Sequence, residues 1–211
     1  MPCSCIRDRE PDADRELLAH LLGFVMPGSK AASLAETLIA ERGNYPRVLT
    51  SAPSRLIKLG VPPKGIDILA TVAQSLERAL LRELTHGNIL AGWQALYDYL
   101  HVSLGHSRRE HVRALFLNSR NALIADEEMG VGTVNQASLH VREVIHRALD
   151  VGATALILVH NHPSGDPKPS REDMQLTNHI RDAARVLGLH LHDHLVVGES
   201  GIQSFRKLGL L

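Results

Sequence analysis

The chain has 211 residues, enough for one large domain or two small domains with apolar cores. It is 44% hydrophobic and 22% charged, which is typical of globular proteins. Lysine plus arginine and aspartate plus glutamate balance at 23 each, and only 3% of residues are aromatic. The whole chain therefore lacks both the basic field of a typical nucleic-acid binder and the rings of a base-stacking platform.

The two cysteines, Cys3 and Cys5, are separated by one residue and have no other partner in the chain. A disulfide at this spacing would be strained, so we expect a reducing compartment. The first residues lack the apolar segment of a secretory signal, and no apolar run reaches the length of a membrane span. These features predict a cytoplasmic protein that does not enter a membrane.

Residues 12–43 carry apolar side chains at helical spacing and predict two helices separated by "PGSK". Asp12 or Asp14 is a suitable N-cap for the first helix, and Gly43 a suitable C-cap for the second. Beyond the turn-rich segment 44–54, we expect a short helix, a turn at 60–64 and a long helix to about Leu84. Segment 85–92 has the composition of a linker, so we predict an all-helical N-terminal domain over residues 1–88.

From residue 93 the pattern predicts one more helix and then the order β-β-α-β-α-β, which indicates an α/β domain over residues 89–211. The run "TALILVH" is apolar and rich in β-branched residues, as in a buried central strand. The last predicted strand is "LHLHDHLVVG", and "IQSFRKLG" follows it as a short tail.

The stretch "LVHNHPSGDPKPSREDM" (158–174) combines two imidazoles, a turn and a carboxylate. Side chains two apart on a strand point to one side, so His160 and His162 can reach one ion. Pro163 ends the strand, and Asp173 lies in the first turn of the helix that follows. Two histidines and an aspartate suit zinc, and three protein ligands leave a position for water, as in catalytic sites. Other divalent metals fit the same ligand types.

Each part of this stretch also has a purely structural interpretation. "SRED" reads as a helix N-terminal cap similar to a capping box, and H-x-H at a strand end is compatible with two partly exposed histidines. The combination favours a metal site, because the structural interpretation requires several independent coincidences.

The segment "HNHPSGDPKPSRED" resembles the JAMM motif of JAB/MPN-domain metalloproteins, which is H-x-H, seven residues, then S-x-x-D. The surrounding segments "REHVRALFLNSRNALIADE", "GTVNQASLHVREVIHRAL" and "DHLVVGESGIQSFRKLGLL" resemble the bacterial RadC-like branch. The resemblance covers residues 107–211 strongly and the N-terminal third more weakly. It implies a JAB/MPN α/β fold with a mixed sheet, which is cytidine-deaminase-like, behind the all-helical domain.

By this resemblance His160, His162 and Asp173 are zinc ligands. Ser170 corresponds to the serine that donates to the oxyanion of a tetrahedral intermediate. Glu110, directly before the apolar run "HVRALFLN", is the best match for the glutamate that acts as general acid and base. It competes with Glu127 and Glu128 in "ADEEM" and with the interpretation of Glu110 as a solvated charge.

The segment "HLHDH" places His190, His192 and His194 at alternating positions, so we predict that they share one strand face. This face could be a second metal site, an ordinary polar face, or a group that orients the ligands of the first site. The segment "LIKLGVPPKGIDILATV" resembles a helix-hairpin-helix that binds the DNA backbone. Pro62 occupies its second glycine position and lacks an N–H, so we predict a degenerate hairpin, although Lys64 could still meet a phosphate.

The zinc nucleoside deaminases need H-x-E and P-C-x-x-C, and serine hydrolases of the elbow type need G-x-S-x-G; neither pattern fits this chain. The resemblance therefore implies a zinc-dependent hydrolase of peptide or isopeptide bonds, with a protein or peptide as substrate. The alternatives are a DNA-associated accessory protein in repair or recombination, and a metal-binding module without turnover. The sequence does not indicate an oligomeric state.

Overall fold

A computed structural model describes residues 10–105, 107, 109–132 and 139–211. Cys3, Cys5 and the last two residues of the second predicted strand lie outside these ranges. Contacts divide the chain into the units Met1–Leu76 and Glu77–Leu211, and the division falls within helix α5 (Pro63–His86). The domain boundary after residue 88 stays a prediction.

The first unit is helical, as predicted. It contains α1 (Glu10–Gly23), α2 (Gly28–Arg42), α3 (Tyr45–Leu49), α4 (Pro53–Lys58) and the first part of α5. Its core is a cluster of buried aliphatic side chains that includes Leu18, Leu22, Ala35, Leu38, Leu56 and Leu69.

Two predictions for this unit are wrong. Helix α1 begins before Asp12 and Asp14, so neither caps it, and the Asp14 carboxylate instead accepts a hydrogen bond from the Tyr45 backbone at 2.9 Å. The segment predicted as a turn contains α3, because Asn44 caps it and Pro46 in its first turn favours helix initiation.

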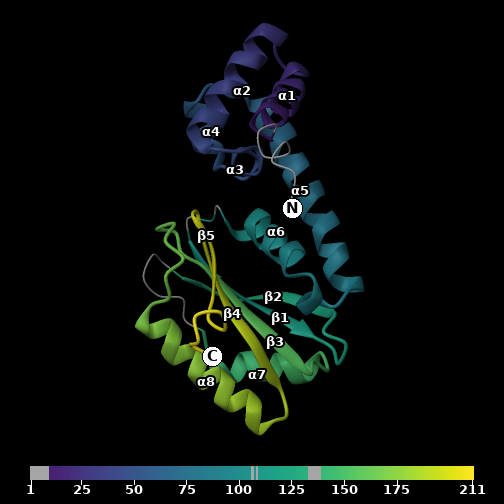
Figure 1. Cartoon of the computed structure of the whole chain (residues 1–211), viewed down its shortest axis with the longest axis vertical. Helices are drawn as coiled ribbons and strands as arrows, with labels where there is room; N and C mark the ends of the chain where they lie inside the picture. The colour runs from purple at the N-terminus through teal and green to yellow at the C-terminus, as the bar shows by residue number, and fades with distance from the viewer. Residues whose placement is uncertain (1–9, 106, 108, 133–138) are drawn as a thin grey trace, which may run out of the picture. The chain divides into compact units, whose positions relative to one another are not determined.

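The second unit is built on one mixed sheet of the order β2-β1-β3-β4-β5. The strands are β1 (Glu110–Leu117), β2 (Leu123–Gly132), β3 (Ala155–Asn161), β4 (His190–Gly198) and β5 (Gly201–Ser204). Among the strands of the described residues, the β3–β4 pair is parallel and the other pairs are antiparallel. The predicted α/β fold with a mixed sheet is therefore confirmed (Figure 1).

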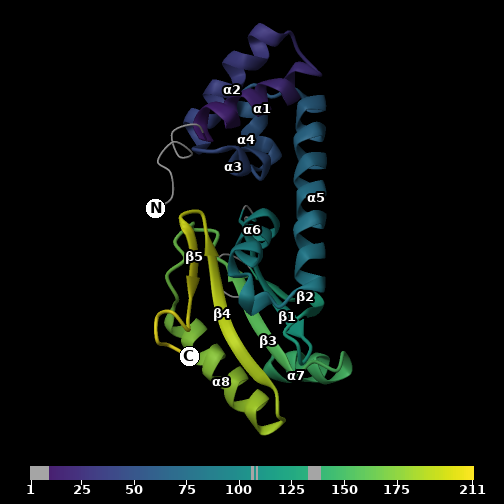
Figure 2. The same ribbon diagram turned by 45° about the vertical axis from the view of Figure 1, so that its right-hand side comes forward.

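Helices cover both faces of this sheet (Figure 2). On one face α7 (Val141–Asp150) and α8 (Arg171–Val186) enclose a core with Ala114, Phe116, Leu156 and Leu158. On the other face α6 (Trp93–Leu104), the short helix η1 (Ile89–Ala91) and the end of α5 pack on Leu115, Ile157, Val159 and Leu195. Strand β3 is buried along its whole length, as expected of the central strand.

The chain departs from the predicted elements at two places in this unit. The tail begins with β5, a four-residue strand whose sequence "GIQS" lacks an apolar alternation. Strand β4 contains a register shift, since Leu156 pairs with Leu191 and Ile157 with Asp193. The extra residue reverses the alternation of side chains, so the prediction that His190, His192 and His194 share one face is wrong.

Candidate metal centre

The candidate site lies where β3 ends and α8 begins. His160 is the penultimate residue of β3, and His162 extends the pairing with β4 by donating its backbone N–H to Val197 O at 2.9 Å. The chain then turns through 163–169, and Ser170 caps α8, whose first turn holds Asp173. A buried strand and a capped helix therefore fix the two ends of the site.

The structure brings together the three predicted metal ligands. The Nε2 atoms of His160 and His162 are 2.9 Å apart. Asp173 Oδ1 lies 3.4 Å from His160 Nε2, and Asp173 Oδ2 lies 3.5 Å from His162 Nε2. Tetrahedral zinc with bonds of about 2.0–2.1 Å needs ligand atoms about 3.3 Å apart. The group could therefore hold one ion of this size with small adjustments.

The cap and the candidate site share Asp173. Ser170 Oγ accepts from the Asp173 N–H at 3.1 Å, while Asp173 Oδ2 accepts from the Ser170 N–H and hydroxyl at 2.8 and 2.7 Å. This is a capping box, so the structural interpretation of "SRED" is also correct. These bonds orient Asp173 and leave Oδ1 directed at His160.

His162 and Asp173 shift each other's pKa toward the charged forms. Burial opposes ionisation of Asp173, but hydrogen bonds with His160 and His162 hold its pKa well below the ordinary range. The pKa of His162 is raised, chiefly by its hydrogen bond to Asp173 against the effect of burial, and the charge of Glu110 adds to the increase. Protons and a metal ion therefore compete for the same nitrogen and oxygen atoms.

Glu110 begins β1 and is half-buried. The antiparallel ladder with β3 ends at Val112 and His160, and Val112 lies two residues after Glu110. The charge of Glu110 contributes to the raised pKa of His162. Its competitors have partners elsewhere: Glu127 forms a two-pronged ion pair with Arg147, and Glu128 contacts His111 Nδ1 at 2.6 Å. The role of Glu110 stays a prediction, but its position is compatible with that role.

Asn161, between the two site histidines, was not predicted as a site residue. Its side chain is buried and faces the segment around Glu110. Asn161 Oδ1 accepts from the His111 N–H at 2.9 Å, and Nδ2 donates to Arg109 O at 2.9 Å. The carboxamide thus makes the hydrogen bonds that a neighbouring strand would make, at the point where the β1–β3 ladder ends.

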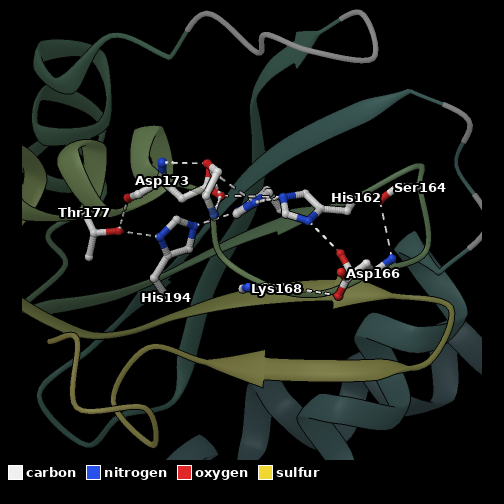
Figure 3. A network of polar contacts seen from close by, with 9 residues as sticks. His162, Ser164, Asp166, Lys168, Asp173, Thr177 and His194 are labelled. Carbon is white, nitrogen blue, oxygen red and sulfur yellow. Dashed lines mark hydrogen bonds and ion pairs between the residues drawn. The ribbon is translucent and has the colours of Figure 1, made fainter.

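The loop after His162 supports the second histidine. His162 Nδ1 lies 2.8 Å from the backbone O of Asp166, and the Asp166 carboxylate accepts from the Lys168 N–H at 3.0 Å (Figure 3). The loop packs closely on the end of β4, because a Cβ added to Gly198 would lie 2.5 Å from Gly165 O. Glycine is required there by backbone contact.

The sequence predicts that Asp193 or His194, if either contacts the site, would orient a ligand imidazole, and the structure brings His194 to His160. The Nε2 of His194 is 2.8 Å from His160 Nδ1, and its Nδ1 is 2.6 Å from Thr177 Oγ1 on α8. Figure 3 shows the ring directed at Thr177. The pKa of His194 is lowered, first by burial and then by the neighbouring His160. His192 instead contacts Asn121 at 2.8 Å.

Fold and site together define an α/β protein with a His/His/Asp group suited to a metal ion at the end of its central strand. Comparison with known proteins agrees, since the model of the "RadC-like JAB domain" family matches residues 90–210. The chain is also similar to the UPF0758 protein of Rhodobacter capsulatus, with 44% identity over 94% of this chain and 93% of that protein. A UPF0758 protein of Ruegeria pomeroyi is 42% identical, over 94% and 89% respectively. The chain belongs to the RadC-like JAB domain family, which confirms the resemblance seen in its sequence.

Each helix in the described part of the chain is too short or too polar to cross a bilayer.

Proposed function

We propose that this protein is a zinc-dependent hydrolase of peptide or isopeptide bonds. The observation that carries the proposal is the convergence of His160, His162 and Asp173, whose ligand atoms all lie within 4.8 Å of one another. Two imidazoles and one carboxylate are a common catalytic zinc set, and three protein ligands leave a fourth position for water or substrate.

A bound zinc ion would supply Lewis acidity, polarising the scissile carbonyl and lowering the pKa of a water molecule to roughly 7. Glu110 would take a proton from that water and pass it to the leaving nitrogen. The water oxygen would form the new bond to carbon, the C–N bond would break, and the products would be a carboxylic acid and an amine. A half-buried carboxylate whose charge acts on His162 suits this proton transfer.

Ser170 would stabilise the developing oxyanion as a hydrogen-bond donor. Its hydroxyl donates to Asp173 Oδ2 at 2.7 Å in this structure, so it would have to turn toward the substrate during the reaction. The Ser170 N–H to Asp173 bond persists when the hydroxyl turns, so the carboxylate stays oriented.

Within residues 10–76, the described part of the helical unit, the structure gives no support to the DNA-associated alternative. In the turn between α4 and α5, the Gly60 N–H is bonded to Ile57 O and the Val61 N–H to Leu56 O, each at 3.0 Å. Pro62 and Pro63 have no N–H to offer. These four turn positions therefore present no spare amide to a phosphate.

The test is hydrolysis of a library of linear peptides and ε-lysine isopeptides by the zinc-loaded full-length protein. Glu110→Gln removes the proposed proton carrier and should lower the rate by at least about a hundredfold while zinc content stays unchanged. Glu128→Gln is the matched control, because it makes the same change at an exposed competitor. Full activity in Glu110→Gln, or activity in wild type that survives removal of zinc, would reject the mechanism.

A further inference from the structure

His194 is a buried histidine that the proposed mechanism does not use. Its side chain is 0% exposed, and both ring nitrogens have partners. Thr177, the partner on α8, is also fully buried, and its Oγ1 lies 2.6 Å from the backbone O of Asp173 as well as 2.6 Å from His194. A continuous chain of hydrogen bonds therefore leads from the first turn of α8 to His160.

The backbone O of Asp173, at one end of this chain of hydrogen bonds, determines where each proton along it lies. A carbonyl oxygen can only accept, so the Thr177 hydroxyl must donate to Asp173 O. The single hydroxyl proton is then used, and Thr177 Oγ1 must accept from His194 Nδ1–H. A fully buried imidazole without an ion partner is neutral, so His194 Nε2 is the acceptor. His160 Nδ1 consequently carries a proton, and in the neutral ring His160 Nε2 carries a lone pair; a hydrogen bond from Nε2 to Asp173 requires the doubly protonated ring.

His162 reaches the same state through a separate contact. Its Nδ1 is 2.8 Å from the backbone O of Asp166, another group that can only accept. His162 Nδ1 is therefore protonated, and its Nε2 also carries a lone pair when the ring is neutral. The two Nε2 atoms that face each other at 2.9 Å are thus both prepared to bind a cation.

We infer that Thr177 and His194 are positioning residues that hold His160 in the tautomer whose Nε2 binds the metal. The inference rests on the proposed function, since it assigns the metal to His160 Nε2. Without the Thr177 hydroxyl, the proton of His194 could lie on either ring nitrogen. With the proton on Nε2, His194 would donate to His160 Nδ1, and the competing Nε2–H form of His160 would become accessible. Metal binding would then require the proton of His160 to move from Nε2 to Nδ1, which would lower the metal affinity.

The surroundings of His194 leave its ring little freedom to rotate. Phe205 stacks on it with ring centroids 4.6 Å apart and an interplanar angle of 22°. Asp193 anchors the turn that holds Phe205, accepting from the Ser204 hydroxyl at 2.5 Å and the Arg206 N–H at 3.0 Å. The stacking therefore fixes the orientation of the His194 ring, and the hydroxyl of Thr177 determines which of its nitrogens is protonated.

The first test measures zinc affinity by competition with a chelator, using the full-length protein. Thr177→Val removes the hydroxyl at nearly constant volume and should weaken zinc binding by about tenfold to a hundredfold. Thr177→Ser restores the hydroxyl and should return the affinity close to the wild-type value. Equal affinity in wild type and a folded Thr177→Val variant would overturn the inference.

A second measurement needs neither metal nor a variant at Thr177. Long-range ¹H–¹⁵N NMR spectra of the metal-free wild type at alkaline pH distinguish histidine tautomers, and a His160→Gln variant assigns the signal. We expect a protonated Nδ1 and a bare Nε2 on His160, and the reverse pattern would overturn the inference. If the proposed function alone is wrong, the wild type would lack hydrolysis or zinc binding, while the NMR spectra would still show the inferred tautomer of His160.

Discussion

Asn161 binds the backbone on both sides of Glu110. Its carboxamide accepts from the His111 N–H and donates to Arg109 O, both at 2.9 Å. The β1–β3 ladder ends at the pair Val112 and His160, so this side chain replaces the missing strand contact. The residue between the two candidate ligands thus holds the proposed proton carrier in place.

We expect Asn161→Ala to destabilise the protein by about 1–3 kcal/mol, because it removes two hydrogen bonds that a buried carboxamide makes to the backbone. Amide hydrogen exchange at His111 should become faster, while zinc stoichiometry stays at the wild-type level. Urea denaturation and exchange NMR measure these effects. Unchanged exchange at His111 would show that Asn161 does not hold this segment.

Zinc affinity should increase with pH. Because the pKa of His162 is raised above its ordinary value of about 6.5, a proton competes with zinc at that ring near neutral pH. Affinity should therefore rise steadily as pH increases through this raised pKa and then level off. Chelator competition across a pH series measures the trend, and a flat profile would contradict it.

In the metal-free protein, the contribution of His162 to stability should fall as pH rises, which is opposite to the trend in zinc affinity. The raised pKa of His162 adds stability that is complete below its unfolded pKa and is lost as pH rises through the folded pKa. The lowered pKa of Asp173 adds stability that is present above its unfolded pKa and is lost as pH falls through the folded pKa. Together they should stabilise the metal-free site most at mildly acidic pH, as thermal unfolding with and without zinc would reveal.

Gly198→Ala should disturb the loop that supports His162. The added Cβ would lie 2.5 Å from Gly165 O and 2.8 Å from Pro167 Cδ, so the loop would have to shift. We expect a loss of about 1–3 kcal/mol in stability and weaker zinc binding. Gly92→Ala is the control, since nothing lies within 4 Å of its added Cβ. Equal effects of the two substitutions in denaturation and zinc titration would refute the contact.

Tyr99→Phe should separate scaffold stability from the metal centre. The Tyr99 hydroxyl donates to Asp126 at 2.5 Å and accepts from Arg113 at 3.2 Å, on the sheet face that α6 covers. Losing these bonds should lower stability by about 1–3 kcal/mol. His160 faces α8 on the opposite side, so zinc affinity in the folded variant should match wild type. A parallel loss of affinity would mean that the two faces are coupled.

Much of this fold could be predicted because the apolar patterns are strong. The continuous apolar run of β3 predicts a central strand, and the predicted order β-β-α-β-α-β corresponds to β1, β2, α7, β3, α8 and β4. Strand β5 escaped prediction because four residues with one aliphatic side chain carry no periodic signal. The bulge near His192 is equally invisible in sequence, because it depends on pairing with β3.

The metal group could be predicted because its residues lie within one short stretch that forms a strand, a turn and a helix start. His194 and Asn161 could not be placed in the same way. The partners of His194, His160 and Thr177, are 34 and 17 residues away, and those of Asn161 are about 50 residues away. The pairing of β3 with β1 and β4 and the packing of α8 on β4 bring these groups together.

The most direct test of the account is the zinc content of the purified, zinc-loaded protein by elemental mass spectrometry. Asp173→Ala is compared with wild type and with Glu172→Ala, which removes the same charge from the neighbouring exposed position. We expect about one zinc per chain in wild type and Glu172→Ala, and almost none in a folded Asp173→Ala variant. No zinc in wild type, or undiminished zinc in Asp173→Ala, would contradict it.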